Sequence, residues 1–261
     1  MQNINLIYAS GPAVITALCL FLLFFWHYRR RLTRNALLYS LMAYASAIAI
    51  KYIFQLISFN AYNSLVDHSP AALGFYYGIQ TALLEGGIAV LVAGYAMGKG
   101  KLDIKDAEGY GLGLAFWENG LLLGVFSLLN YIAYYAILSS NLQQAQTIYD
   151  MLIAKQPELF YSSAKAIPIV AYSVLERISS IMVHFSWGLL AIFAVTYGKK
   201  RFIPLLFISG FLMDFLVPFS NILGLQVEEL LGFCISSLSL LSAFLIIKLT
   251  AINKVNQTAI E

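Results

Sequence analysis

Charged residues are scarce in this sequence: they make up 11% of its 261 residues, against about 25% in soluble domains. A water-exposed surface cannot be covered with so few charges, so the composition excludes a soluble enzyme and a disordered chain. The net charge is only +3. We therefore expect no nucleic-acid partner, since nucleic-acid binding needs a strongly basic surface.

Cysteine and histidine are also rare. The two cysteines, Cys19 and Cys234, lie in apolar runs and form no CxxC pair, which excludes a disulfide framework and a cysteine zinc site. We expect both to be small buried hydrophobes. Only three histidines are present and no HExxH motif occurs, which excludes the helix of the zincin proteases.

Long apolar runs are abundant. Seven stretches are long enough to cross a hydrocarbon core of about 30 Å as helices, and they span approximately 5–28, 36–59, 72–97, 108–138, 166–197, 203–224 and 229–252. The sequence therefore predicts an all-α polytopic protein, a bundle of about seven transmembrane helices. We expect one transmembrane domain over 1–261 that crosses the cell membrane several times, with membrane lipids around it.

The basic residues lie mostly on one side of these spans. Twelve of the sixteen Lys and Arg residues fall after the first, third, fifth and seventh stretches or in their last turns: Arg29, Arg30, Arg31, Arg34, Lys99, Lys101, Lys105, Lys199, Lys200, Arg201, Lys248 and Lys254. Basic residues favour the cytoplasmic side. This predicts an N-terminus outside and a cytoplasmic C-terminus. No basic residue precedes the first stretch, which is therefore not a cleavable signal peptide.

The long outer segment 139–165 carries apolar residues at helical spacing, among them Ala145, Ile148, Tyr149 and Leu152. This pattern predicts a short amphipathic helix lying on the outer surface. Such a helix is either a plain connector or a gate over a cavity.

Ionisable residues inside the spans are few, and each is a functional-site hypothesis because burying a charge in a membrane is costly. They are Lys51, Glu85, Glu118, Glu176, Arg177, His184 and Asp214. At about 1.5 Å per residue, four of them lie roughly 15–20 Å from the ends of four different spans: Glu85, Glu118, His184 and Asp214. We therefore expect one polar pocket near the middle of the membrane.

Small and polar residues form stripes on the same helix faces. The stripes are Gly74, Gly78, Thr81, Glu85 and Ala89; Gly111, Ala115 and Glu118; and Ser173, Arg177, Ser180, His184 and Gly188. Small residues let membrane helices approach closely. These faces should therefore point toward other helices rather than toward lipid.

Two carboxylates and one imidazole are the groups needed to activate water. Glu85 or Glu118 would accept a proton, and His184 would stabilise developing charge. Glu118, His184 and Asp214 could instead hold a divalent metal. Two alternatives stay open: interhelical ion pairing, for instance of Arg177 or Lys51 with Glu176, and a proton or ion path in a transporter.

Two segments resemble known families. The segment Gly113-Leu-Ala-Phe-Trp-Glu118-Asn119 resembles the Gly-Phe-Ala-x-x-Glu-Asn segment of the PrsW family of intramembrane proteases. Glu176-Arg177, followed after six residues by His184, is similar to the Glu-Arg…His segment of the related YhfC family. Both families belong to the superfamily of CAAX-prenyl endopeptidases.

The resemblance implies an intramembrane endopeptidase that acts on a membrane-associated protein or peptide. It places Glu118 and His184 in the active site. Asn119 becomes their polar neighbour, Arg177 a supporting residue, and Glu85 one member of a carboxylate pair.

The sequence departs from the pattern of these families at several positions, two of which concern the expected site residues. Gly86 follows Glu85, so one carboxylate of the pair is missing, and Gly210 stands four residues before Asp214, where a second histidine is expected. The cofactor is accordingly zinc, another divalent metal, or none. The alternative function is that of a catalytically inactive relative that binds membrane proteins in the same pocket.

Overall fold

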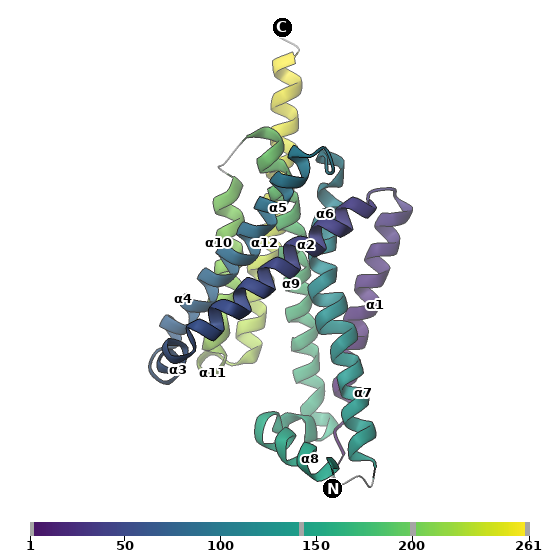
Figure 1. Ribbon diagram of the computed structural model, residues 1–261, viewed down its shortest axis with the longest axis vertical. Helices are drawn as coiled ribbons and strands as arrows, with labels where there is room; N and C mark the ends of the chain where they lie inside the picture. Colours follow the sequence, from purple (N-terminus) through teal and green to yellow (C-terminus); the bar gives the residue numbers. More distant parts are fainter. Residues whose placement is uncertain (1–2, 141–143, 199–201, 259–261) are drawn as a thin grey trace.

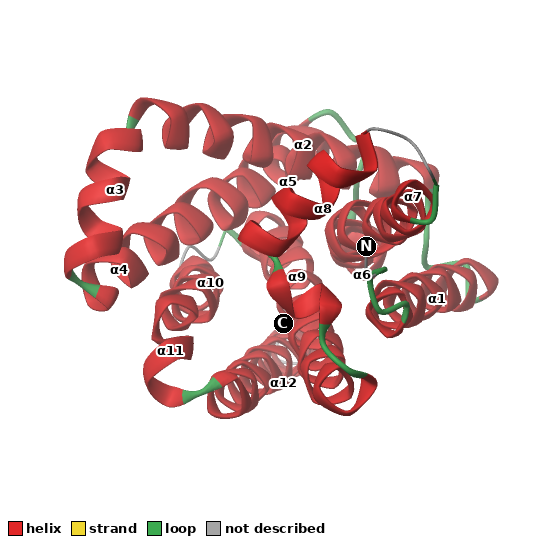
Figure 2. Ribbon diagram, turned by 90° about the horizontal axis from the view of Figure 1, so that it is seen from below, coloured by secondary structure: helices red, strands yellow, loops and turns green. Residues whose placement is uncertain are grey.

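The computed structural model describes residues 3–140, 144–198 and 202–258 (Figure 1). In these ranges nearly all of the chain is helical, and they contain no strand (Figure 2). Seven helical stretches are long and apolar enough to cross a membrane: Ile7–Tyr28, Arg34–Ile57, Pro70–Gly98, Ile104–Leu138, Ser163–Tyr197, Ile203–Leu223 and Leu225–Thr250. The predicted all-α bundle of seven spans is therefore confirmed, and the chain is a multi-pass membrane protein.

Several spans are single helices and others are composite. The single ones are α1 (Ile7–Tyr28), α2 (Arg34–Ile57), α9 (Ser163–Tyr197) and α12 (Leu225–Thr258). The third span joins α4 (Pro70–Gln80), η1 (Thr81–Gly86) and α5 (Gly87–Gly98); the fourth joins η2 (Ile104–Asp106), α6 (Ala107–Ala115), η3 (Phe116–Phe126) and α7 (Ser127–Leu138); the sixth joins α10 (Ile203–Leu216), η6 (Val217–Phe219) and α11 (Ser220–Leu223). The short α3 (Phe59–His68), α8 (Gln144–Lys155) and η4 (Pro157–Phe160) lie between spans.

Local sequence explains where these helices begin and end. The side chain of Thr33 accepts a hydrogen bond from the Ala36 amide at the start of α2. Ser69 caps α4 in the same way, and Pro70 follows it at the position where a missing amide proton costs nothing. Gly198 ends α9 with φ of 59°, a left-handed conformation that glycine adopts without strain.

The central element of the bundle is α9. In its most apolar window 72% of the residues are buried, against at most 33% in the other six spans. It packs mainly against α6 and α12, and its fully buried side chains include Trp187, Leu190 and Ile192. Many outer apolar side chains are exposed, as lipid-facing residues should be. Cys19 is buried as predicted, whereas Cys234 is exposed, so the prediction of a buried Cys234 is wrong.

Glycines allow the closest helix contacts. A Cβ placed on Gly188 of α9 would collide with the backbone of Gly111 in α6. A Cβ on Gly78 of α4 would lie 2.7 Å from the Phe211 carbonyl oxygen of α10. The predicted small-residue stripes therefore lie at helix interfaces.

Two spans contain π-helical segments, η1 and η3. Glu85 lies in η1 and Glu118 in η3. A π-helix is wider than an α-helix, is rare, and is frequent at functional sites. Both carboxylates predicted to be catalytic therefore occur where the helix departs from regular geometry.

The segment 139–165 contains the expected short helix as α8. In Figure 1 this helix lies at the same end of the molecule as the N-terminus. Ala145 and Leu152 are buried, and Leu152 packs in a small cluster with Ile4 and Leu138. Residues 141–143 and 199–201 lie outside the described residues. The membrane orientation and the gating role stay predictions.

Candidate functional site

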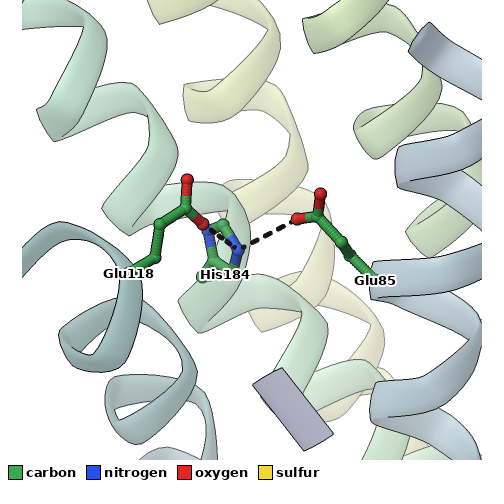
Figure 3. A group of neighbouring side chains, drawn as sticks. All are labelled: Glu85, Glu118 and His184. Atoms are coloured by element: carbon green, nitrogen blue, oxygen red, sulfur yellow. Dashed lines mark ion pairs between the residues drawn. The ribbon is translucent and has the colours of Figure 1, made fainter. Parts of the chain in front are cut away.

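Glu85, Glu118 and His184 converge from three different spans (Figure 3). One nitrogen or oxygen atom of each side chain lies within 4.8 Å of the others. The side chains are mostly buried, with exposed fractions of 10%, 18% and 7%. The polar pocket predicted from helix depth therefore contains these three groups.

The tautomer of His184 follows from its contact with its own helix. Its Nδ1 lies 2.9 Å from the Ser180 carbonyl oxygen, which can only accept a hydrogen bond. Nδ1 therefore carries a proton, and Nε2 faces the pocket. This is the orientation in which a histidine binds a metal.

Nε2 of His184 faces a carboxylate oxygen. Nε2 lies 2.8 Å from Glu118 Oε2 and 3.7 Å from Glu85 Oε2. Both His184 Nε2 and Glu118 Oε2 are buried, and with a proton on Nε2 they form an ion pair. Two electron-rich atoms this close in a buried site need a proton or a cation between them.

Asn119 and Arg177 contact the residues around His184 and Glu118. The buried Asn119 amide donates to Ser180 Oγ at 3.1 Å, next to the His184 ring. Arg177 Nη1 lies 3.5 Å from Asn119 Oδ1 and 3.6 Å from Glu118 Oε1. Arg177 also pairs with Glu176.

On the opposite side of the pocket, Lys51 of α2 neutralises two carboxylates. Its Nζ lies 2.6 Å from Glu85 Oε1 and 3.6 Å from Asp214 Oδ2, and it donates to Thr81 Oγ1 at 3.0 Å. Thr81 in turn donates to Asp214. Four side chains from α2, η1 and α10 thus form one closed network.

This network contradicts the expected Lys51–Glu176 ion pair, and it leaves Asp214 outside the group that could hold a metal. Lys51 does not pair with Glu176, because its ammonium group lies between Glu85 and Asp214. Asp214 lies at the pocket, but it is not in the three-residue group that could hold a metal. Sequence reasoning missed Thr81 and the role of Lys51, although Thr81 shares a helix face with Glu85 and Lys51 is a cation inside an apolar span.

The missing histidine at Gly210 has a physical explanation. A Cβ on Gly210 would lie 2.5 Å from Cζ2 of Trp187, so the indole fills the space that a side chain would need. The Trp187 ring packs beside His184 with centroids 4.7 Å apart, and its Nε1 donates to Ser209 Oγ at 3.1 Å. Likewise, a Cβ on Gly86 would meet Leu206 Cδ2 at 2.5 Å.

The residues present fit a divalent metal. One imidazole nitrogen and two carboxylate oxygens form a ligand set accepted by zinc and related ions. The backbone contact of His184 Nδ1 fixes the ring in the binding orientation. Glu118 Oε2 and His184 Nε2 face each other at 2.8 Å, and these are the atoms that a cation would contact in place of a proton.

A cavity of about 120 Å³ adjoins these groups. Besides the residues above, it is lined by α10 and by the first turn of α12, including Glu228 and Glu229. The fold and the site together define a polytopic membrane protein with a buried carboxylate–histidine centre beside a cavity.

One comparison with known proteins identifies the family. The model of the family described as YhfC intramembrane metalloprotease matches residues 14–229. The chain therefore belongs to the YhfC intramembrane metalloprotease family, which confirms the resemblance predicted from Glu176-Arg177 and His184. Comparisons with curated proteins and with solved structures give no match. The family indicates intramembrane proteolysis.

Proposed function

We propose that this protein is a metal-dependent endopeptidase that hydrolyses a peptide bond of a membrane-associated protein or peptide within the bilayer. The observation that carries the proposal is the buried contact between His184 Nε2 and Glu118 Oε2, 2.8 Å apart, with a Glu85 oxygen 3.7 Å from the same nitrogen. A proton or a cation between these atoms makes the contact favourable. In the proposed function a metal ion takes the place of that proton.

In this proposal Glu118 and His184 hold the metal ion, and Glu85 faces it without being a required ligand. When bound, the ion would polarise the scissile carbonyl and lower the pKa of a water molecule. Arg177 beside Glu118 and Asn119 beside Ser180 keep the two ligands in place.

Glu85 is the proposed proton acceptor. Its Oε1 is fixed by Lys51, which leaves Oε2 directed toward the centre of the site. A water molecule gives a proton to Glu85 while its oxygen attacks the carbonyl carbon. The carbon–nitrogen bond then breaks, and the proton passes from Glu85 to the leaving nitrogen.

The test uses the purified protein in nanodiscs, with metal content measured by mass spectrometry and cleavage of a membrane peptide library by peptide mapping. We expect bound zinc or another divalent metal in wild type. His184→Ala and Glu118→Gln should lose both metal and cleavage. Glu85→Gln should keep the metal but cleave at least about a hundredfold more slowly.

Glu158→Gln is the matched control, because Glu158 lies in η4 and does not line the cavity. The proposal is wrong if wild type binds no divalent metal. It is also wrong if His184→Ala or Glu118→Gln cleaves as fast as wild type. Normal cleavage by Glu85→Gln would remove only the role given to Glu85.

A further inference from the structure

The cavity beside the site carries more negative charge than the site explains. Six carboxylates line it: Glu85, Glu118, Glu176, Asp214, Glu228 and Glu229. Two cations, Lys51 and Arg177, line it as well. A divalent metal would compensate two further charges, so two carboxylates stay without a counter-charge.

The ion pairs show which carboxylates these are. Lys51 contacts Glu85 and Asp214, Arg177 contacts Glu118 and Glu176, and the proposed metal would lie between Glu118 and His184. Glu228 and Glu229 have no ion pair and no side-chain hydrogen bond with any residue that the structure describes. These two carboxylates belong to the first two turns of α12 and line the cavity.

Glu229 gives stronger evidence than Glu228, because its side chain lines the cavity and the residue is only 7% exposed. A charged side chain buried without a partner costs several kcal/mol, so such groups either pair or lose their charge. Its neighbour Glu228, only partly buried, lines the same cavity. Both carboxylates can stay charged only where a cation from outside the described part of the chain lies beside them; without one they take up protons.

We infer that Glu228 and Glu229 form a subsite for a positively charged group of the substrate, the ammonium of a lysine or the guanidinium of an arginine near the scissile bond. The inference rests on the proposed function in that the ligand is a substrate segment. A cation in an apolar segment is expensive in lipid. The acidic side of the cavity would stabilise it and so select the segments that carry one.

Binding tests the subsite without requiring cleavage. The probes are fluorescein-labelled single-span peptides, alike except at one central residue, which is lysine, arginine or norleucine. We expect wild type in nanodiscs to bind the lysine and arginine peptides at least about tenfold more tightly than the norleucine peptide. In the double variant Glu228→Gln/Glu229→Gln this ratio should fall to about one.

Two further variants sharpen the result. Glu229→Gln alone should remove more of the preference than Glu228→Gln, because Glu229 is the more buried carboxylate. Glu158→Gln should keep the wild-type ratio. The inference is overturned if wild type binds all three peptides equally or if the double variant keeps the preference.

Metal content, measured on the same samples, separates two sources of positive charge. If the double variant loses a bound divalent ion that His184→Ala retains, then Glu228 and Glu229 hold a metal and the inference is wrong. If wild type prefers the basic peptides but cleaves none of them with metal present, the proposed function fails while the subsite stands.

Discussion

The two sides of the site differ in how their charges are balanced. On one side, Lys51 neutralises Glu85 and Asp214, and Thr81 completes the network. On the other side, His184 Nε2 and Glu118 Oε2 lie 2.8 Å apart, and a proton or a cation must lie between them. The first side is balanced by the ammonium group of Lys51, whereas the second can exchange a proton for a metal ion. We therefore expect Lys51, Thr81 and Asp214 to serve mainly the stability of the fold, and His184 and Glu118 to serve mainly the proposed metal.

The largest loss of stability is expected when the network around Lys51 is broken. Lys51→Met leaves Glu85 and Asp214 without their cation, which should lower the free energy of unfolding by about 3–5 kcal/mol. Thermal unfolding in detergent micelles measures this. The control is Lys155→Met in α8, an exposed lysine, which should unfold like wild type. Equal unfolding of Lys51→Met and wild type would show that the network contributes nothing.

A smaller loss of stability is expected from a substitution at Gly210, because Trp187 fills the space that a side chain there would need. Gly210→His forces a Cβ against the indole, which should cost about 1–3 kcal/mol. Gly98→Ala is the control, because nothing lies within 4 Å of its Cβ position. Adding Trp187→Ala should relieve the clash and supply a second imidazole. Calorimetric titration should then show tighter zinc binding; unchanged affinity would mean that position 210 does not face the metal.

Asn119→Ala should have an intermediate effect, since it removes the hydrogen bond to Ser180 beside His184. We expect a loss of about 1 kcal/mol in stability and weaker metal binding, because the His184 ring is less well held. Asn35→Ala is the control: its exposed amide contacts only the Lys101 carbonyl. Unchanged zinc affinity in Asn119→Ala would contradict the supporting role.

The smallest loss of stability in the metal-free protein is expected from a change at Glu118. Glu118→Gln should unfold within about 1 kcal/mol of wild type, because the amide keeps the size of the side chain and its oxygen can still accept a hydrogen bond from Arg177 or His184. Added zinc should raise the unfolding temperature of wild type but not of this variant. A loss as large as that of Lys51→Met would show that both sides are equally balanced within the chain.

Hydropathy alone predicted the seven spans, because length and apolarity are local properties of the sequence. Depth counting also predicted that Glu85, Glu118, His184 and Asp214 approach one another, since helical rise is constant. The partner of Lys51 could not be predicted in this way. It depends on how α2 and α10 are rotated about their axes, which many distant contacts decide together.

The carboxylates of Glu228 and Glu229 could not be placed at the cavity from the sequence, because the predicted helix boundary fell between these two residues. The sequence predicts a loop at 225–228 and a span beginning at residue 229, but α12 begins at Leu225. Glu228 and Glu229 therefore lie within a helix that lines the cavity. Hydropathy cannot place such a boundary, because a carboxylate facing a polar cavity counts as a polar residue outside the membrane.

The π-helical segments η1 and η3 determine where the side chains of Glu85 and Glu118 point. A π-turn contains one residue more than an α-helical turn of the same height, so each segment acts as an insertion kept inside a span. Removing one residue from η1, for instance Leu83, would let regular α-helical winding resume while α4 and α5 keep their directions. Glu85 lies inside η1 and would lose the wide turn that holds it. A one-residue deletion would therefore keep every site residue present and still take Glu85 away from His184.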